Sequence, residues 1–206
     1  MRAAAVLIIA LAACRSERAA PRDPPAPGAS LGPFALTYYW VAAEADADGA
    51  ANTQVYDRSC AAVATVPATF ARDLAVAGTG QLVDGRMLTV AGECKCPRSP
   101  CFRVLTDSRW GIGAENRALV PFRSIAVDRG VIPIGTKLWI EELAGVDMPG
   151  VFPELHDGCV VADDVGGAID GAHVDWFVGQ RLNYADLDRA LHLTKVTVHA
   201  GGERCR

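Results

Sequence analysis

Short apolar runs rich in β-branched and aromatic residues alternate along the chain with turns rich in glycine, proline and aspartate. Such runs are typical of β-strands. They occur at residues 34–41, 87–91, 101–105, 124–127, 137–143, 159–162, 174–178 and 195–199. Apolar positions at helical spacing predict two short helices, at 66–77 and 184–193. This pattern favours a mainly β fold built on a small barrel over a doubly wound sheet.

The length of 206 residues suits one well-formed core, so we expect one domain. Its globular part should begin near Phe34, because residues 14–33 are rich in proline, alanine and charge and read as a flexible tether. The net charge of -4 offers no basic surface, so nucleic acid is not an expected partner. We expect a monomer.

The first residues have the layout of an export signal, with Arg2 before an apolar run too short to span a bilayer. Residues 11–14, Leu-Ala-Ala-Cys, resemble a bacterial lipobox, in which residues 1–13 are removed and Cys14 is lipidated. Its acyl chains would anchor the protein stably in the cell envelope. Arg15 favours the periplasmic face of the outer membrane. An ordinary signal peptide cleaved nearby is the alternative.

Six of the seven cysteines remain when Cys14 is set aside, enough for three disulfides. Such bridges form in oxidising compartments, and the sequence alone does not choose their connectivity. A metal site built from the Cys94, Cys96 and Cys101 group with His156 or Cys159 is the alternative, but this spacing lacks a second clean ligand pair. We therefore expect disulfides, no metal and no cofactor. The paired residues would be Cys60, Cys94, Cys96, Cys101, Cys159 and Cys205.

Aspartates stand at the ends of apolar strands, beside glycines, in two segments of the chain. Aspartate is a poor strand residue, so each of these positions needs a local reason. Asp128 and Asp164 could simply cap turns. Asp175 fits that explanation less well, because residues 173–178 alternate as a strand and place its carboxylate beside aromatic neighbours. We predict that Asp175 is functional.

The two segments, 123–137 and 162–177, resemble the three-aspartate (3D) domain, which is shared by the membrane-bound lytic transglycosylase A family and small sporulation cell-wall enzymes. They match the family elements I-A-V-D-x-x-x-I-P-x-G-T and A-x-D-x-G-G-A-I-x-G-x-x-x-D-x-F, including the eleven-residue separation of Asp164 from Asp175. The resemblance implies that residues 34–206 form a six-stranded double-psi β-barrel with short helices and disulfide-bridged loops.

The resemblance also implies cleavage of the β-1,4 bond between N-acetylmuramic acid and N-acetylglucosamine in peptidoglycan glycan strands. The muramyl 6-hydroxyl would attack its own anomeric carbon and give a 1,6-anhydro end. Asp175 matches the catalytic acid/base, and Asp164 and Asp128 match the other two aspartates. The pKa of an acid working near neutral pH must rise from about 3.9. We expect Trp176, Phe177 and the charge of Asp164 to raise it through desolvation and repulsion.

Further groove residues are implied less directly. Gly166 and Gly167 would let the substrate approach the backbone closely, and Tyr38 and Lys137 would line the groove. For Tyr38 and Lys137 a plain barrel-surface position is the alternative. His156 is atypical for the family and could be a ligand or a catalytic group.

The half of the chain before residue 123 carries motifs that do not map onto the familiar transglycosylases. The chain also lacks room for the large second domain that forms one groove wall in the long enzymes of the family. Two other functions stay open. One is a non-catalytic, expansin-like polysaccharide-binding module, and the other is a hydrolytic muramidase in which water is the nucleophile.

Overall fold

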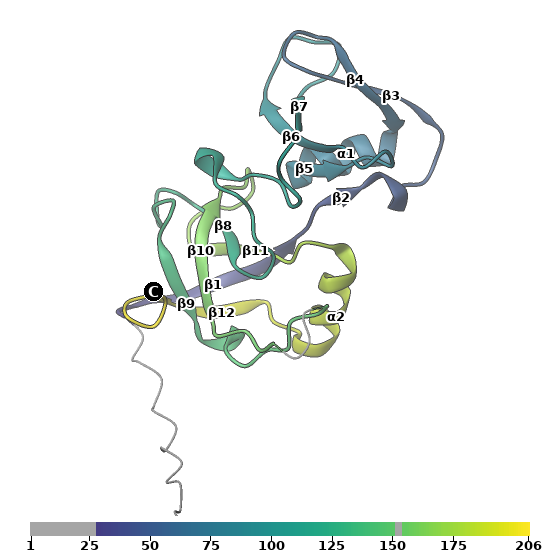
Figure 1. The fold of residues 1–206 in the computed structure, drawn as a ribbon. Coiled ribbons are helices and arrows are strands. Elements are labelled where there is room, and N and C mark those ends of the chain that lie inside the picture. The colour runs from purple at the N-terminus through teal and green to yellow at the C-terminus, as the bar shows by residue number, and fades with distance from the viewer. Residues whose placement is uncertain (1–27, 151–153) are drawn as a thin grey trace, which may run out of the picture.

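The computed structural model describes residues 28–150 and 154–206 (Figure 1). The predicted signal peptide, Cys14 and most of the predicted tether lie outside these ranges. Within them, no helix is long and apolar enough to cross a membrane.

Six strands close into a barrel in the order β1-β11-β8-β10-β9-β12. Neighbours pair in antiparallel fashion, except that β1 runs parallel to β11 and β10 runs parallel to β8. The predicted mainly β fold is confirmed. The strands are β1 (Ser30–Tyr39), β8 (Ser124–Val127), β9 (Lys137–Ile140), β10 (Cys159–Asp164), β11 (His173–Phe177) and β12 (Lys195–Ala200).

Alternation along β11 shows how the barrel is filled. Val174 and Trp176 are fully buried in its core, while His173 and Asp175 between them face outward and are partly exposed. Helix α2 (Arg181–Leu191) lies against the barrel, burying Leu187 in the same core (Figure 1). A short 3-10 helix, η3 (Glu141–Leu143), follows β9 where a longer strand was predicted.

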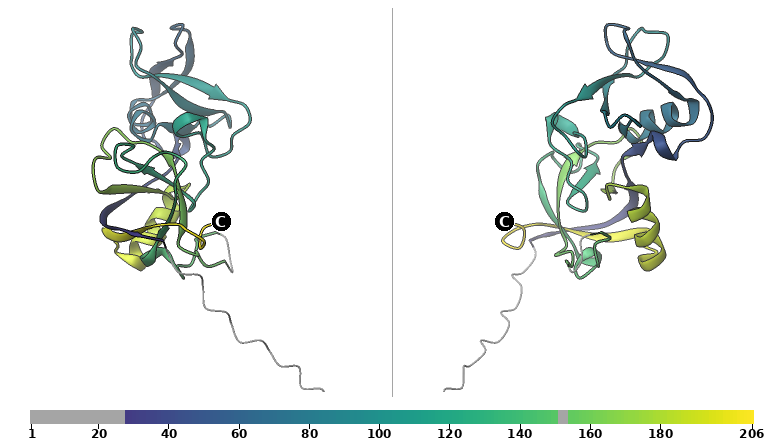
Figure 2. Two further views of the ribbon diagram at one scale, coloured as in Figure 1. Left: turned by 90° about the vertical axis from the view of Figure 1, so that its left-hand side faces the viewer. Right: turned by 45° about the vertical axis from the view of Figure 1, so that its right-hand side comes forward.

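A smaller lobe, residues 42–105, stands beside the barrel (Figures 1 and 2). It has its own core, which contains Phe70 and Leu74 of helix α1. The expectation placed all residues from 34 onward in one barrel, but this lobe lies outside it. The lobe consists of β2 (Ala42–Ala43), η1 (Glu44–Asp46), β3 (Ala51–Tyr56), β4 (Ala62–Pro67), α1 (Ala68–Ala77), β5 (Thr79–Gln81), β6 (Met87–Gly92) and β7 (Cys101–Leu105).

Among the described residues there are three disulfides, as predicted: Cys60–Cys96, Cys94–Cys101 and Cys159–Cys205. The first two lie in the lobe, and the third ties the C-terminus to β10. The sulfur atoms of Cys94, Cys96 and Cys101 lie within 4.8 Å of one another. Because each is bonded to another cysteine, they are not free to ligate a metal, and the alternative of a metal site there is wrong.

The barrel begins earlier than predicted. Residues 30–33 were assigned to the tether, but they belong to β1 and pair with β12, with Gly32 opposite Val198 and Pro33 opposite Thr197. The apolar pattern misses this because Ser, Gly and Pro at the start of β1 carry little apolar signal. Proline is tolerated here because β1 pairs with β11 only from Ala35 onward.

Candidate active site

Two of the three predicted aspartates lie on either side of strand β8, one on each neighbouring strand. Ala126 of β8 is paired with Asp164 of β10 on one side and with Asp175 of β11 on the other. Two strand spacings put their backbones about 10 Å apart, and paired residues direct their side chains to the same face. The residue of β8 between them, Ala126, carries only a methyl group.

Asp175 projects outward from β11 next to β1. The hydroxyl of Thr37 donates a hydrogen bond to Asp175 Oδ1 (2.7 Å), and His173 Nε2 lies 2.9 Å from the same hydroxyl oxygen. Burial raises the pKa of Asp175 above its usual value, against the opposing effects of the Thr37 hydrogen bond and the charge of His173. Trp176 points into the barrel core on the other face, so the predicted desolvation by its ring is wrong.

Asp164 is about as buried as Asp175. Its Oδ1 accepts a hydrogen bond from the Val165 N–H (2.8 Å), and its Oδ2 accepts one from the Tyr39 hydroxyl (3.2 Å). Burial, with a smaller contribution from the charge of Asp175, raises the pKa of Asp164 to about 6. The pKa of Tyr39 is raised well above its usual value, by burial and then by Asp164 and Asp175, so its hydroxyl remains a donor.

A β-bulge in β10 directs the side chain of Asp164 toward this site. The pairing of β10 with β8 shifts between Ala162 and Asp164, which leaves Asp163 as the extra residue. Asp163 is buried and accepts hydrogen bonds from Ser124 Oγ (2.7 Å) and Arg117 Nε (2.5 Å). The structural role of Asp163 was not predicted from the sequence, although the Asp163-Asp164 doublet at a strand end was a visible signal.

The segment that leads from the lobe back to the barrel packs directly on these aspartates. A Cβ atom on Gly113 would lie 2.4 Å from the Asp163 carbonyl oxygen and 2.9 Å from Asp164 Cγ. The same segment supplies Arg117, just after the short helix η2 (Ala114–Asn116). Asp164 is therefore covered by chain that comes from the lobe, and this cover contributes to its burial.

Asp128 has a different setting from the other two aspartates. Its Oδ1 accepts the Gly130 N–H (2.8 Å) and its Oδ2 accepts the Gly171 N–H (2.9 Å). These two backbone hydrogen bonds lower the pKa of Asp128. Asp128 thus stays ionised and ties the turn after β8 to the loop before β11, which is the turn-capping role weighed above.

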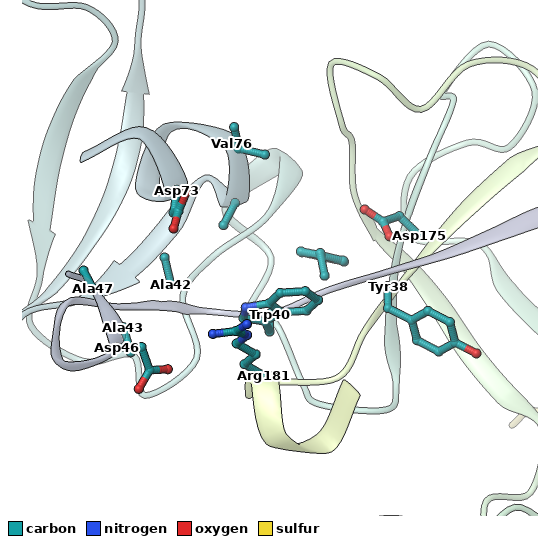
Figure 3. A pocket seen from close by; sticks show the side chains of 12 residues that line it. Tyr38, Trp40, Ala42, Ala43, Asp46, Ala47, Asp73, Val76, Asp175 and Arg181 are labelled. Atoms are coloured by element: carbon teal, nitrogen blue, oxygen red, sulfur yellow. The ribbon is translucent and has the colours of Figure 1, made fainter. Parts of the chain in front are cut away.

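A cavity of about 460 Å³ lies between barrel and lobe, with Asp175 at its barrel side (Figure 3). Trp40 and Arg181 line it between these two sides, and Asp46 and Asp73 lie across from Asp175 on the lobe (Figure 3). We call this the first cavity. Trp40 stacks on Tyr184 with ring centroids 4.9 Å apart, so its ring is held in place.

Tyr38 also borders the first cavity, but its ring packs on Trp176 and Tyr184 and its hydroxyl is buried without a hydrogen-bond partner among the described residues. Burial raises the pKa of Tyr38 to about 12. Its neighbour Tyr39 is the tyrosine that contacts an aspartate. The predicted groove position of Tyr38 agrees with its place at the first cavity, and its substrate-binding role stays a prediction.

The remaining predicted groove residues do not border the first cavity. Lys137 is exposed at the start of β9. Gly166 allows a tight turn, since a Cβ there would lie 2.6 Å from Ile169 Cγ1, whereas Gly167 faces open space. Their substrate-binding roles stay predictions.

His156 has a structural setting. It is buried, its Nε2 donates to the Phe122 carbonyl oxygen (2.6 Å) and its Nδ1 accepts the Gly158 N–H (2.8 Å). Burial lowers its pKa, which favours the neutral ring. Both ring nitrogens are occupied, so neither is available as a ligand or as a catalytic group.

The comparisons with known proteins agree with this architecture. Residues 123–186 match the family model of the 3D domain, which confirms the resemblance found in the sequence. The fold resembles that of MltA from E. coli with bound chitohexaose, at 19% identity and a TM-score of 0.58, over 82% of this chain and 71% of that one. It also resembles the membrane-bound lytic murein transglycosylase from Agrobacterium tumefaciens, at 15% identity and a TM-score of 0.55, over 82% and 73% of the two chains. No curated protein matches the chain in sequence.

Proposed function

We propose that the protein is a peptidoglycan lytic transglycosylase with Asp175 as its catalytic acid/base. The observation that carries the proposal is the position of Asp175, which borders the cavity between barrel and lobe with a pKa raised by burial. The 3D-domain match and the MltA-like fold support the same class of activity. The E. coli protein of similar fold holds a chito-oligosaccharide, which supports glycan strands as the substrate class.

In the first step, protonated Asp175 would give its proton to the glycosidic oxygen. The bond from the anomeric carbon to that oxygen breaks, its electron pair stays with the leaving sugar, and the muramyl ring becomes oxocarbenium-like. The raised pKa of Asp175 favours the proton-bearing form that this step needs. Thr37 holds the carboxyl in place through its hydrogen bond to Oδ1.

In the second step, the muramyl 6-hydroxyl would attack the anomeric carbon and pass its proton to the Asp175 carboxylate. The enzyme returns to its starting state and no water is consumed. Asp164 would act as a positioning residue, since its charge and that of Asp175 interact and the Tyr39 hydroxyl holds it in place. Asp128 would act only by holding the loop before β11 in place, through the hydrogen bond that it accepts from the Gly171 N–H.

Mass spectrometry of digested peptidoglycan tests the reaction. We expect 1,6-anhydromuramyl ends from the full chain, and loss of these ends with Asp175→Asn. The matched control is Asp186→Asn, on the exposed side of α2. Reducing ends would instead indicate a hydrolytic muramidase, and binding without fragments would indicate an expansin-like module.

The proposal extends to location and fold. We propose that lipidation of Cys14 anchors the protein to the outer membrane, in line with its lipobox-like sequence and with the disulfides expected of an oxidising compartment. Metabolic labelling with a fatty acid should mark the wild type but not Cys14→Ser. We also propose that the closed barrel is of the double-psi type, which its two parallel strand pairs support.

A further inference from the structure

A second cavity, of about 590 Å³, adjoins the first and shares Ala43, Asp46 and Arg181 with it. The two cavities differ in charge. The first is bordered by three carboxylates, Asp46, Asp73 and Asp175, and by one guanidinium, Arg181. The second is bordered by Arg109 and Arg181 against Asp46 alone. An anionic substituent on a bound strand would therefore be repelled from the first cavity and attracted to the second.

Neither arginine is engaged by a carboxylate of the protein. Across residues 28–150 and 154–206, the Arg181 side chain makes no hydrogen bond or ion pair, and the Arg109 side chain makes only a cation-π contact with the Trp110 ring, 4.9 Å from its centroid. Arginines elsewhere on the surface, such as Arg72 and Arg189, lie beside aspartates. The donors of Arg109 and Arg181 are thus free for a ligand.

Trp110, which lines the second cavity, is held in place by close packing. Gly179 has a φ of +78°, and a Cβ there would lie 3.3 Å from the Trp110 ring and 2.9 Å from Pro121. Trp110 therefore packs closely on the start of α2, next to Gln180 and Arg181. Because Arg109 stacks on Trp110, the two guanidinium groups are presented from neighbouring parts of one surface.

We propose that Arg109 and Arg181 form a subsite for a carboxylate carried by the glycan strand, so that the protein selects anionic muramyl-containing strands over neutral chitin-like strands. This rests on the proposed function for the identity of the substrate. The carboxylate could be the lactyl group of a peptide-free muramyl residue or a carboxylate of a stem peptide. Both present the planar anion that a guanidinium binds through paired hydrogen bonds.

Calorimetric titration of the full chain, carrying Asp175→Asn to prevent cleavage, tests the subsite. The probes are peptide-free strands of alternating N-acetylglucosamine and N-acetylmuramic acid, the same strands bearing stem peptides, and a neutral chito-oligosaccharide of equal length. Adding Arg181→Gln should weaken binding of an anionic strand about tenfold, while binding of the neutral strand changes less than about twofold. Arg109→Gln should act in the same direction. Arg189→Gln, on the same helix but outside both cavities, is the control.

Loss confined to peptide-free strands would identify the lactyl carboxylate, and loss confined to peptide-bearing strands would identify the stem peptide. Equal loss for neutral and anionic strands, no loss with either arginine variant, or no binding of anionic strands would overturn the subsite. Cleavage by the wild type is measured separately. A protein that cleaves nothing but needs Arg181 for anionic strands would refute the proposed function and leave the subsite standing.

Discussion

The barrel and the lobe are held together by different means. The barrel is a closed ring of strands around a large core that includes Trp176, and it carries Asp164 and Asp175 opposite the same residue, Ala126. The lobe has a smaller core, open sheet edges and two disulfides. The residues predicted to be catalytic thus lie on the closed barrel, while the lobe supplies the opposite wall of the first cavity.

The largest expected effects on stability come from substitutions in the two cores, one in the barrel and one in the lobe. Trp176→Ala in the barrel and Phe70→Ala in the lobe each remove a fully buried aromatic ring, which should cost about 3–5 kcal/mol. All four tryptophans lie outside the lobe, so their fluorescence reports on the barrel and on the segments bordering the cavities. In urea, we expect Trp176→Ala to lower the fluorescence midpoint strongly.

Phe70→Ala should instead expose the lobe to proteolysis before the tryptophan fluorescence changes. Coincident transitions by both probes would show that barrel and lobe unfold as one unit, as the single-domain prediction requires.

The next largest effect on stability is expected from the disulfides of the lobe. Removing the bridge that spans 36 residues with Cys60→Ser and Cys96→Ser should destabilise the lobe by about 3 kcal/mol, because the unfolded chain regains the freedom that this link removes. Limited proteolysis should then cut within residues 42–105 while the barrel stays intact. Equal protection of wild type and variant would contradict the view that the lobe depends on its bridges.

A pH-dependent effect of about 2 kcal/mol is expected at Asp164. Its pKa of about 6 means that the folded protein keeps a proton that the unfolded chain releases near pH 4. That stabilising contribution is complete below about pH 4 and is lost as the pH rises through about 6.

Asp164→Asn cannot ionise, so it should be more stable than wild type at pH 7.5, by about 2 kcal/mol, and equal to it at pH 4. Denaturant midpoints at the two pH values measure this. A variant that is less stable at pH 7.5 would show that the hydrogen bonds of Asp164 outweigh its burial.

The smallest effect compares two adjacent glycines. Gly166→Ala places a methyl group against Ile169 and should cost about 1 kcal/mol, whereas Gly167→Ala meets open space and should change stability by less than about 0.5 kcal/mol. Thermal midpoints would separate them. If binding of glycan strands falls in Gly167→Ala while its stability does not, the predicted substrate-binding role of that glycine gains support.

The sequence predicted the barrel better than the lobe, and the reason is physical. Strands β8, β10, β11 and β12 of the barrel coincide with apolar runs in the sequence, whereas in the lobe only β6 and β7 do so. The hairpin of β3 and β4 was missed because Ala, Asn and Gln interrupt its few Val and Thr positions, and few of its residues are deeply buried. Small, polar strands of this kind give little periodic signal.

At the site, the motifs located Asp164 and Asp175, but they did not reveal the residues that surround them. Thr37, Tyr39 and Arg117 come from distant segments, and only the strand register and the bulge at Asp163 bring them together. Tyr38 was predicted to line the groove and borders the first cavity, but the sequence alone does not reveal that its neighbour Tyr39 is the one that reaches Asp164.

The most direct test is to digest purified peptidoglycan with the full chain and with its Asp175→Asn variant, and to quantify 1,6-anhydromuramyl ends by mass spectrometry. We expect abundant anhydro ends from the wild type and from the Asp186→Asn control, and at least a hundredfold fewer from a folded Asp175→Asn, about the share of catalysis expected of one acid/base group. Undiminished anhydro ends from Asp175→Asn would contradict the assignment of Asp175 as the acid/base.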